Sequence, residues 1–211
     1  MLIYIVVKVY DNIALVLNGK FPSSEILVKK ILSSDFIIAV DGAANELKKF
    51  NIHPNVVIGD FDSINDKINK STKYINKPDQ SKTDFRKSLE WLVAQKFSKV
   101  NIFGISGKND DHFLGNIYTF NEFSHLIKLQ AFTDSSIITP LFEKREFKSH
   151  KDQKVSLFVL NDSAIINSTN LEYRLDNFEL FPSDSAIRNI SKGSTFTVQS
   201  TSKLLVFQSI N

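Results

Sequence analysis

The sequence predicts an α/β N-terminal domain, with helices on both faces of a parallel sheet, followed by an all-β sandwich. Over residues 13–132, short uninterrupted apolar runs alternate with segments of helical periodicity, which is typical of buried parallel strands joined by helices. From residue 134 onward no helical period is convincing, and short β-rich runs alternate with polar, Pro or Gly residues. We therefore expect an α/β domain over 1–133 and a β-sandwich domain over 134–211.

In the first part, apolar runs predict strands at Ile13–Leu17, Phe36–Val40, Val56–Ile58, Thr72–Asn76, Val100–Phe103 and Leu126–Phe132. Helices are expected where cap-forming residues precede apolar side chains at helical spacing. They are predicted after Pro22-Ser23-Ser24, after Asp41, near Asn65–Asn69, over Thr83–Gln95, and from about Asp111 to Phe123. The first helix should bury Ile26, Leu27, Ile31 and Leu32.

In the second part, seven short runs predict a sandwich of about seven to eight strands. The runs are Ile137–Ile138, Lys154–Leu160, Ala164–Ile166, Asn170–Tyr173, Ala186–Ile190, Ser194–Gln199 and Lys203–Gln208. Polar or Pro/Gly residues separate them, as is usual for turns between short strands.

The composition excludes several classes of protein. With 42% hydrophobic and 23% charged residues it is that of an ordinary globular protein, and the net charge of +3 is too small to indicate nucleic acid or an anionic membrane as a partner. The absence of Cys excludes disulfides and thiolate chemistry. The apolar opening at residues 1–7 is too short to span a bilayer and lacks a basic flank, so we expect an extra strand or a loose extension, and a cytoplasmic protein.

A pair of carboxylates follows the predicted strand Val56–Ile58, in the run Gly59-Asp60-Phe61-Asp62-Ser63. Alternation along an extended chain would put Asp60 and Asp62 on one side and Phe61 on the other. Asp84 follows the next strand-like run, so all three acids should reach the ligand edge of the sheet. Turn formation or helix capping is the more common role of a single Asp-x-Asp. Three acids at one edge instead favour a Mg²⁺ site for phosphate chemistry.

Two further stretches should reach the same edge. The small residues of Asp41-Gly42-Ala43-Ala44-Asn45 would let a helix N-terminus approach an anion, although tight packing explains them equally well. In Asp111-His112, the His could cap the helix, pack, or donate to a phosphate. Lys82, Arg86 and Lys108 could supply positive charge for a polyphosphate. The chain has no P-loop and no nucleophile elbow, so phosphoryl-type transfer would depend on positioning and charge.

Four motifs occur in order at Asp41–Asn45, Pro54–Ser63, Asp79–Asp84 and Asp111–Asn116. They read D-G-A-A-N, P-N-V-V-I-G-D-F-D-S, D-Q-S-K-T-D and D-H-F-L-G-N. This series resembles the thiamine pyrophosphokinase family, whose members carry D-G-[GA]-[AS]-N, P-x-x-[IV]-[IV]-G-D-x-D-S, D-Q-x-x-T-D and D-H-x-L-x-N. Weaker similarities are Asn18–Pro22 to N-G-x-F-P and Asn170–Leu175 to G-L-x-[WY]-x-L.

The resemblance implies transfer of pyrophosphate from ATP to the hydroxyl of thiamine, giving AMP and thiamine diphosphate, with Mg²⁺ as cofactor. It implies a homodimer with active sites at the interface, each between the α/β domain of one subunit and the sandwich of the other. It also implies roles for residues at the matching positions. These are Asp60, Asp62 and Asp84 for Mg²⁺, Asp111 and His112 at the phosphates, Asp41, Gly42, Asn45, Thr83 and Lys108 for the nucleotide, and Gln80, Arg188 and Asn189 for thiamine.

Two positions depart from the family pattern. Many members have Arg two residues before the D-H pair, where this chain has Asn109, and Lys108 would supply the charge without the bidentate geometry of a guanidinium. Many have Ser-Asn on the thiamine-facing strand, where this chain has Arg188-Asn189, and a cation beside cationic thiamine is unexpected. Two alternatives therefore stay open: a pyrophosphokinase for another small hydroxymethyl heterocycle, and a non-catalytic nucleotide- or thiamine-binding protein.

Overall fold

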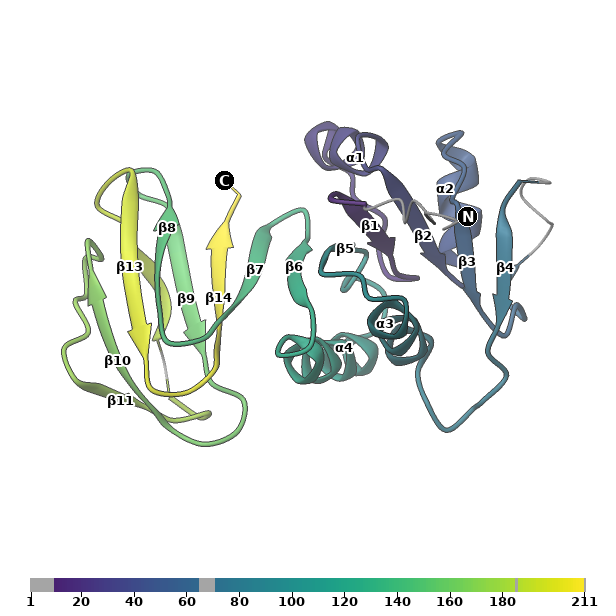
Figure 1. Cartoon of the computed structure of the whole chain (residues 1–211). Coiled ribbons are helices and arrows are strands. Elements are labelled where there is room, and N and C mark those ends of the chain that lie inside the picture. The colour runs from purple at the N-terminus through teal and green to yellow at the C-terminus, as the bar shows by residue number, and fades with distance from the viewer. Residues whose placement is uncertain (1–9, 65–70, 185, 211) are drawn as a thin grey trace, which may run out of the picture.

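The computed structural model describes residues 10–64, 71–184 and 186–210 (Figure 1). The predicted N-terminal strand or extension and the predicted helix near Asn65–Asn69 lie outside these residues. Among the residues described, no helix is both long and apolar enough to cross a bilayer.

The first part of the chain alternates strands and helices as the sequence predicts. Its strands are β1 (Ile13–Val16), β2 (Phe36–Val40), β3 (Val56–Gly59), β4 (Lys73–Asn76), β5 (Lys99–Phe103) and β6 (Lys128–Phe132). Its helices are α1 (Glu25–Leu32), α2 (Ala43–Lys49), α3 (Asp84–Ala94) and α4 (Asp110–Phe123). The predicted strands and helices that fall on described residues are thus confirmed, with ends shifted by no more than a few residues.

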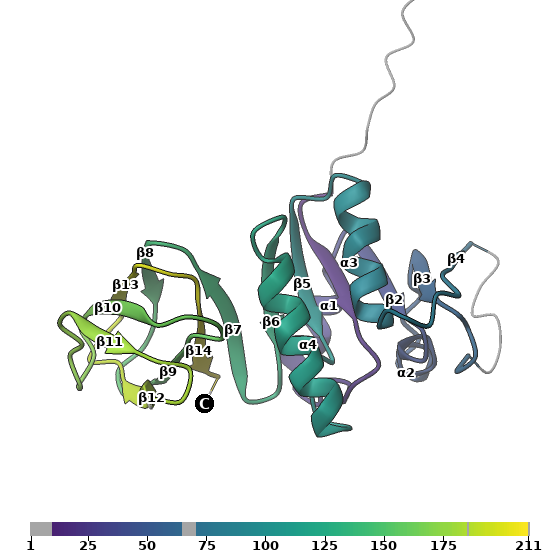
Figure 2. The same cartoon turned by 90° about the horizontal axis from the view of Figure 1, so that it is seen from below.

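The six strands are parallel and lie in the order β4-β3-β2-β1-β5-β6. Alternate side chains of β1 face opposite sides: Ala14 and Val16 pack in the core with α1 and α2, whereas Ile13 and Leu15 pack with α3 and α4. Figure 2 shows α3 and α4 on the same face of the sheet. The strand order reverses between β1 and β5, which is where open α/β sheets bind ligands.

One prediction about α1 is wrong in part. Leu27 and Ile31 are buried against the sheet, but Ile26 and Leu32 are 76% and 56% exposed. The helix has only eight residues and contacts the sheet along one narrow stripe, so the residues beside that stripe point to solvent.

The second part contains eight strands among the described residues. They are β7 (Ser136–Leu141), β8 (Lys144–Lys148), β9 (Lys154–Phe158), β10 (Ala164–Thr169), β11 (Phe178–Leu180), β12 (Ala186–Ile190), β13 (Thr195–Ser200) and β14 (Leu204–Ser209). The sequence did not predict β8 and β11. The predicted strand at Asn170–Tyr173 is wrong, because only an isolated bridge from Leu171 to Ser191 forms there.

These eight strands form two layers. β11-β10-β13-β8 is a separate four-stranded sheet, whereas β12-β9-β14-β7 continues the sheet of the first part through antiparallel pairing of β7 with β6. A second core fills the space between the layers, where the rings of Phe147 and Phe196 stack at 5.1 Å. One mixed sheet of ten strands therefore crosses the position where we predicted a domain boundary, and the division at 133/134 stays a prediction.

Candidate active site

An open cavity of about 610 Å³ lies at the point where the strand order reverses. Its walls come from the loops after β1, β2, β3, β4 and β5 and from the first turns of α3 and α4. Ten of the predicted site residues line it: Asp41, Asp60, Asp62, Gln80, Lys82, Thr83, Asp84, Lys108, Asp111 and His112. The structure therefore brings four separate sequence motifs to one place.

Three carboxylates form the acidic part of the cavity. Asp41, Asp60 and Asp62 can each offer one oxygen, and these oxygens lie within 4.8 Å of one another. We expected an extended backbone between Asp60 and Asp62. The structure instead has a turn there, because Phe61 has a left-handed φ of 70°. Its ring packs against the apolar core and lies edge-on to Tyr74, with 5.6 Å between the ring centroids. Asp60 and Asp62 thus reach the same side through a turn rather than through strand alternation.

The family resemblance assigns Asp41 to the nucleotide, but its position among the three acids also suits a cation ligand. It is 5% exposed, and among the described residues its Oδ1 is a buried oxygen without a hydrogen-bond partner. Its φ of 44° is unusual for a residue other than Gly. An unpartnered buried carboxylate oxygen is costly, and a cation among three carboxylates would offset that cost. The donor set contains only oxygen, which suits Mg²⁺.

Hydrogen bonds stabilise the charged form of Asp60. The side chain of Gln80 donates to Asp60 Oδ2 at 2.6 Å, and this bond is the main reason that the pKa of Asp60 lies below its ordinary value. The backbone N–H of Asp62 lowers the pKa further. Gln80, which the family resemblance assigns to thiamine, therefore also orients one of the three acids.

Asp84 lies in the same cavity but, within the described residues, outside the group of three close acids. Burial raises the pKa of Asp84, and the neighbouring Lys87 partly reverses that effect. Lys87 Nζ lies 2.8 Å from Asp84 Oδ1, and the Lys87 side chain is only 3% exposed. Asp84 is thus neutralised by an internal lysine.

Lys87 is a cavity residue that we did not predict from the sequence. Lys87 lines the cavity, one helical turn after Asp84 on α3. The available signal was its position three residues after an acid on the side of a helix that faces the core. A buried ammonium beside the cavity is a candidate contact for the oxygens of an anion such as phosphate.

Backbone hydrogen bonds join the loops after β1 and β5, both of which line the cavity. The N–H of Gly19 donates to Gly104 O at 3.0 Å, and the N–H of Lys20 donates to Ser106 O at 2.7 Å. Lys108 Nζ donates to Asn18 Oδ1 at 2.9 Å, which fixes this cation at the cavity wall. The loop after β5 is therefore tied to the loop after β1 across the point where the strand order reverses.

Gly104→Ala should destabilise the protein by about 1–3 kcal/mol, because Gly104 has a φ of 68° and a Cβ there would lie 2.4 Å from Leu17 O. Gly115→Ala is the matched control: it lies inside α4, and apart from its chain neighbours and the local helix backbone no described atom is within 4 Å of its added Cβ, so that variant should be stabilised by up to about 1 kcal/mol. Urea unfolding measures both. Equal stabilities of the two variants would contradict the prediction.

The first turn of α4 forms another wall. Asp111 and His112 are exposed there, and the His112 backbone N–H donates to Asp111 Oδ1 at 2.7 Å. Asn109 is the N-cap residue of α4 and also lines the cavity. The His112 side chain can thus reach a bound anion from the helix start.

Some predicted residues do not line the cavity. Gly42 and Asn45 lie behind it: a Cβ at Gly42 would be 2.6 Å from the Asn18 side chain, and Asn45 Nδ2 donates to Ser63 O at 2.7 Å. Arg86, which we expected to supply positive charge for a polyphosphate, does not line the cavity, and its guanidinium is paired with Glu122 on α4.

Arg188 and Asn189 lie far from the cavity within one chain. They belong to β12, the edge strand of the ten-stranded sheet, and four strands separate β12 from β5. At about 4.8 Å per strand this is roughly 24 Å. Asn189 is buried and holds Tyr173 by its backbone N–H and carbonyl, whereas Arg188 is exposed, with a φ of 59° at a bulge.

Fold and site together define an α/β protein with three close carboxylates and several lysines around a cavity at the carboxyl edge of its parallel strands. The family model described as "Thiamin pyrophosphokinase, catalytic domain" matches residues 28–131. The chain is therefore similar to the thiamine pyrophosphokinase family.

Two curated relatives show the same similarity. Thiamin pyrophosphokinase 1 of Caenorhabditis elegans is 29% identical over 168 residues, which are 68% of this chain and 65% of that protein. Thiamine pyrophosphokinase of Bacillus subtilis is 28% identical over 151 residues, which are 66% of this chain and 70% of that protein. The chain thus matches slightly less than two thirds of the length of the nematode protein.

Solved structures show the same fold. The crystal structure of thiamine pyrophosphokinase from Bacillus subtilis superposes with a TM-score of 0.81 at 21% identity, covering 93% of this chain and 97% of that one. The thiamin pyrophosphokinase structure from Candida albicans gives a TM-score of 0.84 at 17% identity, covering 95% and 90%. The similarity extends through both parts of the chain.

Proposed function

We propose that this chain is an ATP:thiamine diphosphotransferase. The thiamine hydroxyl oxygen attacks the β-phosphorus of ATP and loses its proton to solvent, the bond from the β-phosphorus to the bridging α–β oxygen breaks, and AMP leaves. The observation that carries the proposal is the cluster of Asp41, Asp60 and Asp62 in the cavity of a chain similar to thiamine pyrophosphokinases, with one buried carboxylate oxygen that lacks a partner among the described residues.

A cation fits this cluster, and we propose that Asp41, Asp60 and Asp62 hold Mg²⁺, with Asp84 at the side. When bound, Mg²⁺ would neutralise charge on the polyphosphate. The predicted set was Asp60, Asp62 and Asp84. We add Asp41, because one of its oxygens lies within 4.8 Å of oxygens of Asp60 and Asp62, whereas Asp84 is not in this group among the described residues.

The chain's own cations that line the cavity would contact the polyphosphate. Lys87 lies beside Asp84, Lys108 is held by Asn18, and Lys82 precedes α3, where its ammonium would have to leave Glu90, its partner at 2.9 Å. His112 would donate to a phosphate oxygen from the first turn of α4. Such positioned charges are the main protein contribution to this type of transfer. Gly42 and Asn45 would act on the nucleotide indirectly: Gly42 leaves room for the Asn18 side chain, and Asn45 holds the Ser63 carbonyl.

Release of AMP in the presence of a panel of acceptors tests the function. The protein is mixed with Mg²⁺–ATP and with thiamine, with other small heterocycles that carry a hydroxymethyl or hydroxyethyl group, or with no acceptor. Release that depends on thiamine supports the proposal. Release only with another acceptor would indicate a related pyrophosphokinase, and binding without release would indicate a binding protein.

We propose a homodimer with active sites at the interface and two functional units divided near residues 133 and 134. Support comes from the separation of about 24 Å between Arg188 and the cavity, because residues of β12 can reach a cavity only in a second copy. Gln80 would contact thiamine from one subunit and Arg188 or Asn189 from the other. A cytoplasmic location stays a prediction.

Mixing two inactive variants should restore part of the activity if sites are shared. Asp60→Asn removes the metal-binding half and Arg188→Glu changes the acceptor-binding half, whereas changes at Asn189 would disturb its bonds to Tyr173. In a heterodimer one site carries both defects and the other carries none. Co-refolding, with heterodimers separated by charge and assayed for AMP release, provides the measurement. Heterodimers without activity would mean that each site comes from one chain.

A further inference from the structure

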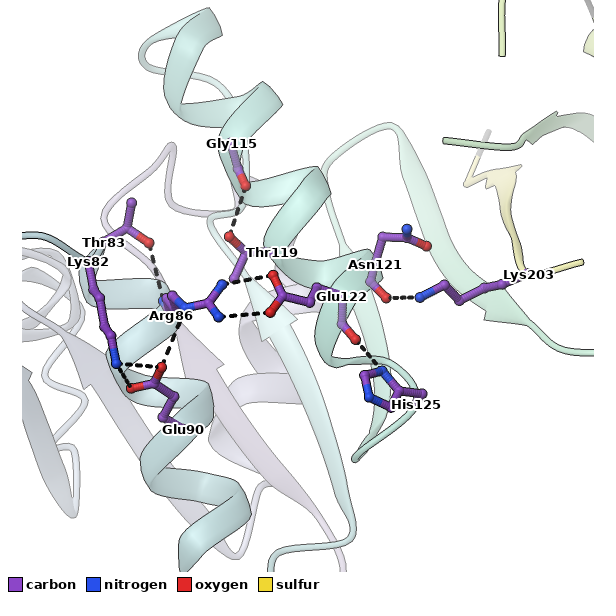
Figure 3. A network of polar contacts seen from close by, with 10 residues as sticks. All are labelled: Lys82, Thr83, Arg86, Glu90, Gly115, Thr119, Asn121, Glu122, His125 and Lys203. Carbon is purple, nitrogen blue, oxygen red and sulfur yellow. Dashed lines mark hydrogen bonds and ion pairs between the residues drawn. The ribbon is translucent and has the colours of Figure 1, made fainter. Parts of the chain in front are cut away.

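A series of ion pairs runs along α3 and across to α4 (Figure 3). Lys82 Nζ lies 2.9 and 3.1 Å from the two carboxylate oxygens of Glu90, and Arg86 Nε lies 3.4 Å from Glu90 Oε1. The two terminal nitrogens of Arg86 donate to the two carboxylate oxygens of Glu122, each at 2.8 Å. A fork-shaped pair of this kind fixes orientation as well as distance.

Arg86 lies next to the cavity without lining it, whereas both of its neighbours, Phe85 and Lys87, do line it. Its backbone N–H also donates to Thr83 Oγ1 at 3.3 Å, which caps α3. One residue therefore closes the first turn of α3 and joins that turn to α4. Glu122 lies on α4, whose first turn carries Asp111 and His112 into the cavity.

Stability alone is a weak explanation for this arrangement. The side chains of Arg86 and Glu122 are 34% and 52% exposed, and ion pairs so exposed contribute little to folding. Apolar side chains from both helices, such as Leu89 and Phe120, already share one core. Apolar packing sets the distance between two helices but has little directional preference, whereas a bidentate pair has a strong one.

We propose that Arg86 and Glu122 are positioning residues for the proposed reaction. Their pair holds the first turn of α3 against α4, so that Lys82, Asp84 and Lys87 on one wall keep a fixed geometry relative to Asp111 and His112 on the other. The proposal rests on the proposed function for its effect on turnover, but its effect on ATP binding can be measured independently.

The test is a double-mutant cycle with Arg86→Met, Glu122→Gln and the double variant, together with Arg86→Lys. The readouts are the Kd of Mn²⁺–ATP by calorimetry, kcat, the KM values of both substrates, and Tm. Lys29→Met is the matched control, because it removes one charge of the exposed Lys29–Glu25 pair on α1. A misplaced wall should lower kcat/KM for ATP about 10- to 100-fold.

We expect Arg86→Met to weaken Mn²⁺–ATP binding and to lower kcat, with the KM of thiamine and the Tm close to those of Lys29→Met. The double variant should be no worse than either single variant, and Arg86→Lys should recover part of the loss. Effects equal to those of Lys29→Met, or fully additive effects, would overturn the inference. If the wild type released no AMP, the proposed function would fail. ATP affinity would then decide alone, and unchanged or undetectable ATP binding would overturn the inference.

Discussion

Replacing Asp60 or Asp62 with Asn should lower AMP release by about 10³ or more while the protein stays folded. Each change removes one negative charge from three carboxylates whose oxygens lie within 4.8 Å of one another, and it keeps the shape of the side chain. Neither side chain is buried, so Asp62→Asn should leave stability nearly unchanged, whereas Asp60→Asn should lower it slightly because it removes the charge that accepts from Gln80. The rate with saturating Mg²⁺–ATP and thiamine provides the measurement.

Mn²⁺ affinity and urea unfolding complete this experiment. Both variants should bind Mn²⁺ more weakly than the wild type, with the same unfolding slope. Asp162→Asn is the control, because it removes an exposed carboxylate in the loop before β10. Near-normal turnover in either cavity variant would show that the metal assignment is wrong.

Lys87→Met should lower both stability and turnover. The change leaves Asp84 in a partly desolvated position without the ammonium 2.8 Å away, and breaking such a pair should cost about 2–3 kcal/mol, because Asp84 is only partly buried. Loss of a positioned cation should lower the rate about 10²- to 10³-fold. Urea unfolding and AMP release measure the two effects. Lys99→Met, at an exposed position, is the control.

The stability loss in Lys87→Met should depend on pH in a defined direction. Burial already raises the pKa of Asp84 in the folded protein, and loss of Lys87 raises it further. A carboxyl whose pKa is raised on folding favours the folded state below its unfolded pKa and loses that contribution as the pH rises. The difference from the wild type should therefore be largest at neutral pH and shrink on acidification through the raised pKa of Asp84.

The double variant Asp84→Asn/Lys87→Met separates packing from chemistry. It replaces both charges, so it should recover much of the lost stability and none of the lost activity. Recovery of activity would mean that Lys87 serves only to neutralise Asp84. A stability loss of Lys87→Met that is equally large at every pH would contradict the role assigned to the Asp84–Lys87 pair.

Local features of the sequence determined most of the first part of the fold. Buried strands such as Phe36–Val40 need an uninterrupted apolar run, and the start of α3 needs a cap such as Thr83, so both are visible in neighbouring residues. β8 was missed because it has a single apolar residue, Phe147, among charged ones. Its pairing with β13 and the stacking of Phe147 on Phe196 stabilise it from a distance.

The sequence by itself determined the motifs that reach the cavity, since residues after parallel strands must meet at one sheet edge. Only the tertiary structure decided which side chains act together there. It placed Asp41 among the close acids, paired Lys87 with Asp84, turned Arg86 toward Glu122, and put Arg188 on a distant edge strand. The physical reason is that burial, ion pairing and strand order depend on contacts between residues far apart in the chain, which spacing along the sequence does not contain.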